Sequence, residues 1–272
     1  MRTDLAAECL KKSKTLPEGV IVHTQPLKSG KIELVEILSE EAEREIGKPK
    51  GVYVTLELPP FWDESQSVPE LAEAAAGGLR QLLPQEGTVL VVGLGNREIT
   101  PDALGPLAAE QIVVTRHLSG QLSGLPELRS VAALAPNVLG KTGMEVVETV
   151  RAVTEEIRPS ALIVVDALAS ASLERLGRTV QIANTGIVPG SGVMNARKAL
   201  NEGTLHVPVI AVGIPTVVDL SNLCQQETGE SMMTTPRQVD LLIRRGASFL
   251  ASVINRALHP SLSLEELLLL QS

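Results

Sequence analysis

The sequence predicts an α/β fold in which a mostly parallel sheet is covered by helices on both faces. From residue 88 onward, short apolar runs alternate with longer amphipathic stretches, which is the order expected of β-α-β units. The runs at 88–94, 161–166 and 207–213 are apolar almost throughout, as buried parallel strands are. Before residue 59, apolar and polar residues alternate, which predicts a smaller, strand-rich N-terminal section.

The N-terminal part divides into a short helix, a strand-rich section and a second helix. Residues 1–15 have helical spacing, and the segments 31–37 and 51–58 alternate as strands of a half-exposed sheet do. Pro59 and Pro60 end this section, and an Ala-rich helix follows over 69–83. We therefore expect a single α/β domain over 1–272, with 20–58 as a candidate peripheral β subdomain.

The second part is predicted to alternate regularly. In chain order the expected elements are strand 88–94, helix 101–111, strand 112–117, helix 143–157, strand 161–166, a helix near 190–201, strand 207–213 and helix 236–257. The segment 214–235 has mixed polarity and predicts a loop or a short helix beside the sheet. Residues 262–270 predict a terminal apolar helix that docks on the body or on another subunit.

Composition excludes several functions. The net charge is -8, from 32 acidic and 24 basic residues, and the chain has only four aromatic residues. Nucleic acid is therefore a poor partner, whereas a basic protein or peptide is permitted. The two cysteines, Cys9 and Cys224, lie outside any metal-binding or disulfide spacing. Because no signal peptide or apolar span is present, we expect a cytoplasmic protein without membrane contact.

Two aspartates are the candidate catalytic residues. Asp102 follows the apolar run 88–94, and Asp166 ends the apolar run 161–166. In an open α/β sheet, ligands bind at the carboxyl ends of the strands, so the two carboxylates are expected to share one crevice. If they approach within a few ångströms, they titrate as a pair that shares a proton, and such a pair can hydrolyse peptide bonds.

Each aspartate also has a purely structural interpretation. Thr100-Pro101-Asp102 is a good helix start, with Thr100 as the N-cap and the Asp102 charge near the positive end of the helix dipole. Capping and catalysis explain Asp102 about equally well. Asp166 is placed to cap a turn at 167–170, but its burial beside an apolar run makes an unpaired charge expensive. Asp166 is therefore the stronger candidate from the residues alone.

Two glycine-rich segments are candidate ligand sites. Gly93-Leu94-Gly95 begins a dinucleotide-binding pattern, but Glu98 stands where the third glycine belongs, so a tight turn at Gly95 and Asn96 is the better interpretation. The loop at 184–197 runs into a predicted helix, and its Gly190, Ser191 and Gly192 are candidate donors for a substrate oxyanion. Asn96 is a further candidate contact to substrate.

The four histidines are scattered and none has a metal-ligand spacing. Only His117, at the end of the predicted strand 112–117, is expected to reach the crevice. A metal site would need Asp102, Asp166 and His117 together. We expect neither a metal nor a cofactor.

The sequence resembles the germination proteases of spore-forming bacteria, which degrade small acid-soluble spore proteins. Similar segments run in order through nearly the whole chain: 2–6, 93–96 with 100–106, 115–118, 165–169, 185–187 with 189–193, and 213–219. The resemblance implies an aspartic-type endopeptidase with the architecture of the hydrogenase-maturation proteases. It places Asp102 and Asp166 at the positions of the two proposed catalytic aspartates. It also implies a zymogen, a homotetramer, a spore-core location and small acid-soluble spore proteins as substrates.

The chain departs from the family pattern at four places. Met1 directly precedes the segment Arg2-Thr3-Asp4-Leu5, which leaves no room for the usual propeptide. Asn184 stands where an aspartate is expected, and Ala171 replaces a basic residue. The stretch 221–235 is short. The rival hypotheses are a metal-dependent maturation-type protease of the same fold and a non-enzymatic module that binds a peptide or a nucleotide.

Overall fold

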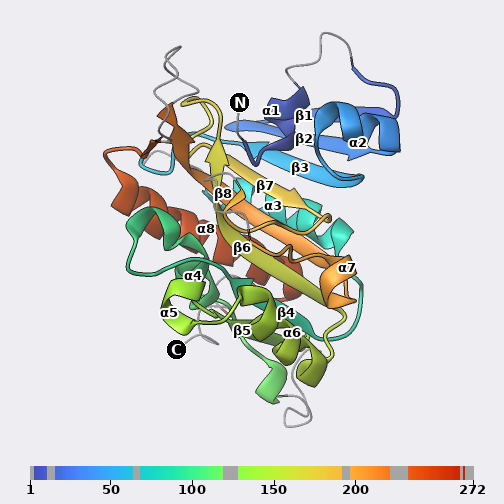
Figure 1. The fold of residues 1–272 in the computed structure, drawn as a ribbon, viewed down its shortest axis with the longest axis vertical. Helices are drawn as coiled ribbons and strands as arrows, with labels where there is room; N and C mark the ends of the chain where they lie inside the picture. Colours follow the sequence, from blue (N-terminus) through green and yellow to red (C-terminus); the bar gives the residue numbers. More distant parts are fainter. Residues whose placement is uncertain are drawn as a thin grey trace.

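One nine-stranded sheet organises the fold, which we describe from a computed structural model (Figure 1). The structure describes residues 3–10, 16–63, 68–118, 128–191, 197–220, 232–263 and 266. The strand order is β1-β2-β3-β7-β8-β6-β4-β5, and β9 pairs with β8. The strands are β1 (Val20–Leu27), β2 (Gly30–Ile37), β3 (Gly51–Glu57), β4 (Val89–Gly93), β5 (Val131–Leu134), β6 (Ala161–Ser170), β7 (Thr179–Ala183), β8 (Val209–Asp219) and β9 (Met233–Thr234).

The helices connect these strands and cover the sheet. The α-helices are α1 (Ala6–Leu10), α2 (Glu40–Ile46), α3 (Val68–Leu82), α4 (Leu104–Ala109), α5 (Leu139–Thr142), α6 (Val146–Ile157), α7 (Glu202–Leu205) and α8 (Val239–Leu258). The 3-10 helices of the described residues are η1 (Thr100–Asp102) and η2 (Arg116–Leu118). None of the helices in the described part of the chain is both long and apolar enough to cross a membrane.

The sheet is parallel in one half and antiparallel in the other. The neighbours β8, β6, β4 and β5 pair in parallel, which confirms the predicted α/β class. The strands β1, β2 and β3 form antiparallel pairs, and β3 joins β7, which is itself antiparallel to β8. The strand-rich section 20–58 therefore extends the same sheet. A short hairpin joins β1 to β2, whereas α2 lies in the connection from β2 to β3.

Helices pack on both faces of the sheet, as predicted. On one face α3, α4 and α8 enclose a core that includes Leu79, Leu104 and Leu250; in Figure 1, α3 and α8 pass behind the strands. On the other face α6 and α7 cover Leu90 and Leu162, while α1 and α2 pack against β1, β2 and β3. Burial of these aliphatic side chains is the main stabilising contribution.

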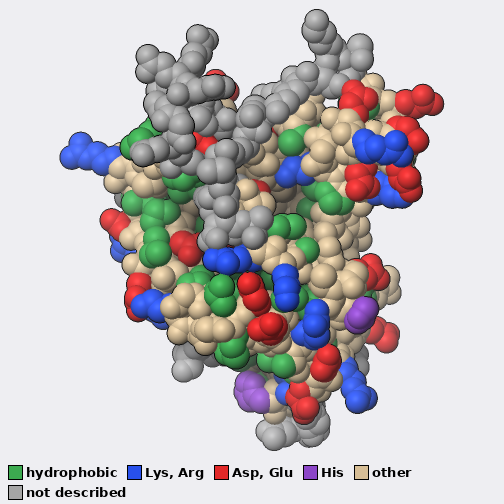
Figure 2. Space-filling view, in the orientation of Figure 1, with side chains coloured by type: hydrophobic (Ala, Val, Ile, Leu, Met, Phe, Trp, Pro, Cys, Tyr) green, Lys and Arg blue, Asp and Glu red, His purple; other side chains and the backbone are tan. Residues whose placement is uncertain are grey.

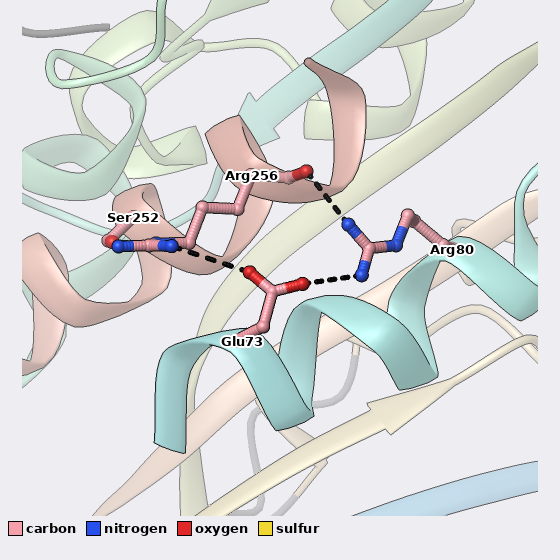
Figure 3. A network of polar contacts seen from close by, with 4 residues as sticks. All are labelled: Glu73, Arg80, Ser252 and Arg256. Carbon is pink, nitrogen blue, oxygen red and sulfur yellow. Dashed lines mark hydrogen bonds and ion pairs between the residues drawn. The ribbon is translucent and has the colours of Figure 1, made fainter. Parts of the chain in front are cut away.

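A charged network joins α3 to α8 on the first face (Figure 3). The Glu73 carboxylate accepts from Arg80 at 2.6 Å and from Arg256 at 3.3 Å. Arg80 also donates to the Arg256 carbonyl oxygen at 3.3 Å, and Arg256 donates to the Ser252 hydroxyl at 3.3 Å. The network fixes the relative position of two helices that otherwise meet through aliphatic side chains.

Several elements differ from the sequence prediction in the region before residue 190. Residues 112–117 do not form a strand: the Val113 N–H is taken by the Asn255 side chain of α8 at 2.9 Å, so no strand partner is needed. The neighbouring strand is instead β5, whose Val131 N–H bonds the Thr115 hydroxyl at 3.0 Å. Strand β7 and helix α2 were not predicted, because both are short: β7 has five residues, and α2 buries only Ala42 and Ile46.

The later predictions are also corrected in part. Residues 197–200 are not helical, and Leu200 forms an isolated antiparallel bridge with Ile187; the rest of the predicted helix, 192–196, lies outside the described residues. Strand β8 continues to Asp219 and β9 follows at Met233, where a loop or short helix was expected. Most of the stretch 221–235 and of the predicted terminal helix 262–270 lies outside the described residues.

Candidate active site

Asp166 lies where two neighbouring strands separate. Strand β4 ends at Gly93, which is opposite Val165 of β6, so Asp166 is the first residue of β6 beyond that edge. Strand β6 continues beside β8, with Asp166 opposite Gly213. The predicted turn at 167–170 is therefore absent, and the Asp166 carboxylate instead accepts from the N–H of Ala167 at 2.8 Å. Asp166 is 6% exposed, as a buried candidate residue is expected to be.

Asp102 reaches the same edge from the 3-10 helix η1. Its carboxylate accepts from the backbone N–H of Asn96 at 2.7 Å, which ties η1 to the turn that follows β4. The predicted N-cap is corrected: Ile99, not Thr100, precedes η1, and it makes no side-chain cap. The Thr216 hydroxyl on β8 donates to the Pro101 carbonyl oxygen at 2.8 Å. Asp102 is therefore held in place by the turn that follows β4, and the 3-10 helix that carries it is held by β8.

The glycines near Asp102 allow close backbone packing. Gly95 has φ +119°, and a Cβ there would lie 2.0 Å from the Asp102 carbonyl oxygen. A Cβ at Gly93 would lie 2.1 Å from the Gly105 carbonyl oxygen. The conformation of Gly95 thus supports the tight-turn interpretation, which explains the glycine without a bound nucleotide. Glu98, which breaks the dinucleotide pattern, forms an ion pair with Lys141 of α5.

A cavity of about 550 Å³ brings both aspartates together. Asp102 and Asp166 line it, and so does a third carboxylate, that of Asp4. Most of the remaining lining is apolar, and the residues include Leu94, Ile99, Val138, Leu139, Val146, Ile187, Val188 and Val217. Among the described residues, Arg197 and Glu145 are the other charged residues of the wall. The cavity is thus a largely apolar cleft that contains four acidic residues.

Burial raises the pKa of both aspartates, and neighbouring charges act on Asp166. Burial raises the pKa of Asp166 well above its usual range, and the negative charges of Asp102 and then Asp4 raise it further, against the hydrogen bond from Ala167. Burial also raises the pKa of Asp102, while the hydrogen bond from Asn96 lowers it. Carboxyl groups in this environment retain a proton to higher pH than free carboxylic acids do, as a general acid requires.

Of the candidate substrate contacts in the glycine-rich loop, some line the cavity and others do not. Gly190 lines it, with φ +72°. The Ser191 hydroxyl donates to the Asp4 carboxylate at 2.9 Å, and the Ser191 N–H is taken by the Val188 carbonyl oxygen at 3.2 Å. Gly192 lies outside the described residues. Asn96 lines the cavity, and its side-chain oxygen accepts from the N–H of Glu98 at 3.0 Å.

His117 does not lie at the cavity, which corrects its predicted position. It is exposed on η2, beside the amino end of β5, because residues 112–117 do not form the strand that would have carried it to the crevice. Thr115, two residues earlier, bonds Val131 at the start of β5. Within the described ranges, no group of three or more His, Cys, Asp or Glu residues is arranged to hold a metal ion.

Asn184 and Ala171 have structural contacts. The Asn184 side chain accepts from the N–H of Val52 at 2.8 Å and thereby joins β7 to β3. The N–H of Ala171 donates to the buried Glu8 carboxylate at 2.7 Å.

Sequence reasoning missed two residues that shape the cavity. Thr216 positions η1, and Asp4 adds the third carboxylate. Asp4 belongs to the N-terminal segment that resembles the family, but its sequence separation from Asp166 gives no local sign that the two meet. Only the docking of the chain's first residues on β6 brings Asp4 into the cavity.

The chain is similar to germination proteases throughout its length. The family model described as germination protease matches residues 2–228. The germination protease of Caldanaerobacter subterraneus subsp. tengcongensis is 39% identical, covering 98% of this chain and 97% of the relative. That of Clostridium perfringens (strain ATCC 13124) is 37% identical over 98% of each chain. That of Geobacillus sp. (strain WCH70) is 42% identical over 80% of this chain and 64% of the relative.

A solved structure, the [NiFe] hydrogenase maturation protease HycI from Thermococcus kodakarensis KOD1, is similar over 65% of this chain and 98% of its own. Its TM-score is 0.37 and its sequence identity is 16%.

Proposed function

Because the chain belongs to the germination protease family and is a peptidase, we propose that it is an endopeptidase in which Asp102 and Asp166 form the catalytic pair. The observation that carries the proposal is the shared cavity, in which burial raises the pKa of both acids and the charge of Asp102 raises that of Asp166 further. An ordinary capping role for either aspartate does not require such an environment.

The proposed reaction is hydrolysis by a water held between the two carboxyl groups. The ionised member of the pair takes a proton from the water as its oxygen attacks the peptide carbonyl carbon. The protonated member gives its proton to the substrate, and the carbon–nitrogen bond breaks with a proton on the leaving amine. Each turnover consumes one water and returns the pair to its singly protonated state.

The cavity wall fits an extended peptide better than a small polar ligand. Apolar side chains such as Ile99, Val188 and Val217 surround the acids, and Ile99 and Val188 are 53% and 39% exposed. Exposed apolar residues beside a catalytic pair provide contact area for substrate side chains. The backbone near Gly190 is the proposed source of oxyanion donors.

We further infer the substrate and setting from the family. The proposed substrates are small acid-soluble spore proteins, cleaved early in germination in the spore core. The family resemblance also supports synthesis as a zymogen and assembly as a homotetramer. These proposals apply the properties of the family to this chain.

Cleavage of a small acid-soluble spore protein by purified variants tests the catalytic pair. Asp102→Asn and Asp166→Asn should each lower kcat at least about 1,000-fold while the circular dichroism spectrum stays unchanged. Asp240→Asn, at an exposed position of α8, is the matched control and should retain full activity. Cleavage by either site variant at the wild-type rate would exclude the pair mechanism.

Treatment with a chelator separates this mechanism from a metal-dependent one. Activity that survives exhaustive EDTA dialysis is expected, because the proposed chemistry uses only carboxyl groups and water. Loss of activity on dialysis and its recovery with a divalent ion would favour the metal-dependent rival.

A further inference from the structure

One edge of strand β6 lies open beside the two aspartates. Strand β4 pairs with β6 as far as Gly93 and Val165, and the Leu94 N–H then donates to the Val165 carbonyl oxygen at 2.8 Å. Strand β6 continues to Ser170 and stays paired with β8 on its other side. Among the described strands, none therefore pairs with residues 166–170 on the side from which β4 has withdrawn.

The backbone groups that face this open edge belong to alternate residues, because hydrogen-bonding groups along a strand point to its two sides in turn. The N–H of Leu162 donates to the Pro208 carbonyl oxygen, next to β8, so the even-numbered residues of β6 face β8. The Val165 carbonyl oxygen faces the β4 side instead. Ala167 and Ala169 are the next residues with the same direction, and both face the open edge.

The Ala167 carbonyl oxygen is the group that this edge leaves without a donor. The Ala167 N–H donates to the Asp166 carboxylate at 2.8 Å. The Ala169 carbonyl oxygen accepts from the Asp4 N–H at 2.9 Å. Within the described part of the chain, neither an N–H nor a side chain donates to the Ala167 carbonyl oxygen. An unpaired acceptor on a strand edge is a template for pairing with another chain.

The same edge forms part of the wall of the candidate cavity. Asp166, Ala167 and Ala169 all line the cavity. Ala167 is partly exposed, whereas its neighbours Asp166 and Leu168 are buried. Because Ala167 and Ala169 carry only a methyl group, their side chains leave room for a second backbone along the edge. An accessible acceptor thus lies one residue from a candidate catalytic acid.

The rest of the cavity suits the side chains of a chain that lies along this edge. Apolar side chains from three separate segments line it: Ile99 after β4, Leu139 in α5 and Val188 in the glycine-rich loop. Successive side chains of an extended peptide point to opposite faces, so they can contact different walls. The backbone acceptor and the apolar walls together fit an extended peptide.

We propose that the substrate adds to β6 as an extended strand, with one substrate N–H donating to the Ala167 carbonyl oxygen and the scissile bond beside Asp166. This inference rests on the proposed function, because it describes how the substrate of that site is held. Main-chain bonds of this kind require an extended backbone with free N–H groups. The substrates are therefore segments that are unfolded or that open locally, whereas residues inside a stable helix have no free N–H to give.

An ester scan of a peptide substrate tests this pairing. The peptide is the shortest segment of a small acid-soluble spore protein that the wild-type protein cleaves at a single bond, which mass spectrometry identifies. Each peptide of the series has one amide other than the scissile one replaced by an ester, which removes a single N–H. One ester should lower kcat/KM by about 5- to 10-fold, as loss of one hydrogen bond does, while the esters on either side of it stay within about two-fold.

A structure of the complex shows where the sensitive amide binds. Asp102→Asn, which the proposed mechanism makes inactive, is crystallised with the uncleaved peptide. The N–H whose ester lowers kcat/KM should lie about 2.9 Å from the Ala167 carbonyl oxygen, measured from nitrogen to oxygen. All the changes in the scan are made in the peptide, so the folding of the protein does not affect its result.

The outcomes separate this inference from the proposed function. If the wild-type protein cleaves no such peptide, the proposed function fails and this inference falls with it. If Asp102→Asn or Asp166→Asn cleaves normally, the catalytic pair is wrong. If both variants are inactive but no ester lowers kcat/KM beyond two-fold, pairing with β6 is overturned and the pair remains. Equal losses from adjacent esters, or a sensitive N–H that lies away from Ala167, would also overturn it.

Discussion

The Cα of Gly95 packs so closely against the Asp102 carbonyl oxygen that a Cβ at position 95 would lie 2.0 Å from it. The same glycine has φ +119°, a conformation that residues with side chains rarely adopt. The turn that follows β4 and the 3-10 helix that carries Asp102 are therefore fitted to each other. The position of one candidate catalytic acid depends on the absence of a side chain seven residues earlier.

Gly95→Ala should therefore displace Asp102. Because both steric overlap and an unfavourable φ oppose alanine, we expect a loss of about 3 kcal/mol in the free energy of unfolding. An active site displaced by about 1 Å loses on the order of 100-fold in kcat/KM. Denaturant unfolding and cleavage assays measure the two effects. Gly77→Ala, within α3 and without close neighbours, is the control and should leave both quantities at or above the wild-type values.

Asp166→Asn should increase stability, although we expect it to abolish activity. Because the pKa of Asp166 is raised in the folded state, ionisation favours the unfolded chain. The contribution of Asp166 to the free energy of unfolding is therefore fully present below the unfolded pKa of about 3.9. This contribution is lost as pH rises through the folded pKa. Asparagine keeps an acceptor for the Ala167 N–H without the charge. We expect its melting temperature to exceed the wild-type value at pH 7.5 and to converge with it near pH 4; a lower value at both pH values would contradict this account.

The sequence predicted the central strands because their residues carry a simple signal. Strand β4 and the first five residues of β6 are uninterrupted apolar runs, and Asp102 and Asp166 mark the edge of the sheet where the candidate cavity lies. Strand β7 gave no such signal, since Thr179 and Gln181 are polar yet buried. Gln181 tolerates burial because it bonds the docked N-terminal segment at Asp4 and Ala6. Neither β7 nor the N-terminal segment is recognisable from its own local sequence, because each depends on contacts with the other.

The contribution of Asp4 was unpredictable for the same reason. The sequence separates it from its partner Ala169 by 165 residues. Local patterns report on turns, helices and strands, whereas such a contact depends on the complete sheet. His117 shows the converse error: its predicted position depended on a strand at 112–117, and the Asn255 side chain supplies the hydrogen bond that removes the need for one.

Glu73→Gln should weaken the junction of α3 and α8 (Figure 3). Hydrogen bonding to Arg80 is the main cause that lowers the pKa of Glu73, so its contribution is present above the unfolded pKa and is lost as pH falls through the folded pKa. The side chain is 49% exposed, so solvent screening limits the expected loss to about 0.5–1 kcal/mol at pH 7. Urea unfolding at low and high salt measures it, and the difference from wild type should shrink at about 1 M salt. An undiminished difference would point to packing instead of charge.

His259 should make the protein less stable in mild acid. It is 1% exposed, and burial lowers its pKa, with the charge of Arg129 acting in the same direction. Stability at this site is therefore constant above the unfolded pKa of about 6.5 and falls below it, by at most about 1.4 kcal/mol per pH unit. Unfolding free energies at pH 7.5 and pH 5.5 should differ less in His259→Gln than in wild type. His23→Gln, at an exposed position of β1, should keep the wild-type difference.

Glu8→Gln should loosen the N-terminal segment. The Glu8 carboxylate is 6% exposed and accepts two backbone N–H groups, from Ala171 and Ser172. An amide has one acceptor oxygen and places an NH₂ group against the second donor, which costs about 1–3 kcal/mol when a buried N–H loses its partner. The N–H of Ala6 bonds the Gln181 side chain. Its hydrogen exchange should therefore accelerate by about 10-fold or more in the variant. Glu18→Gln, at an exposed position before β1, should leave this exchange unchanged. Equal protection in Glu8→Gln and wild type would show that the other contacts of the segment are sufficient to hold it in place.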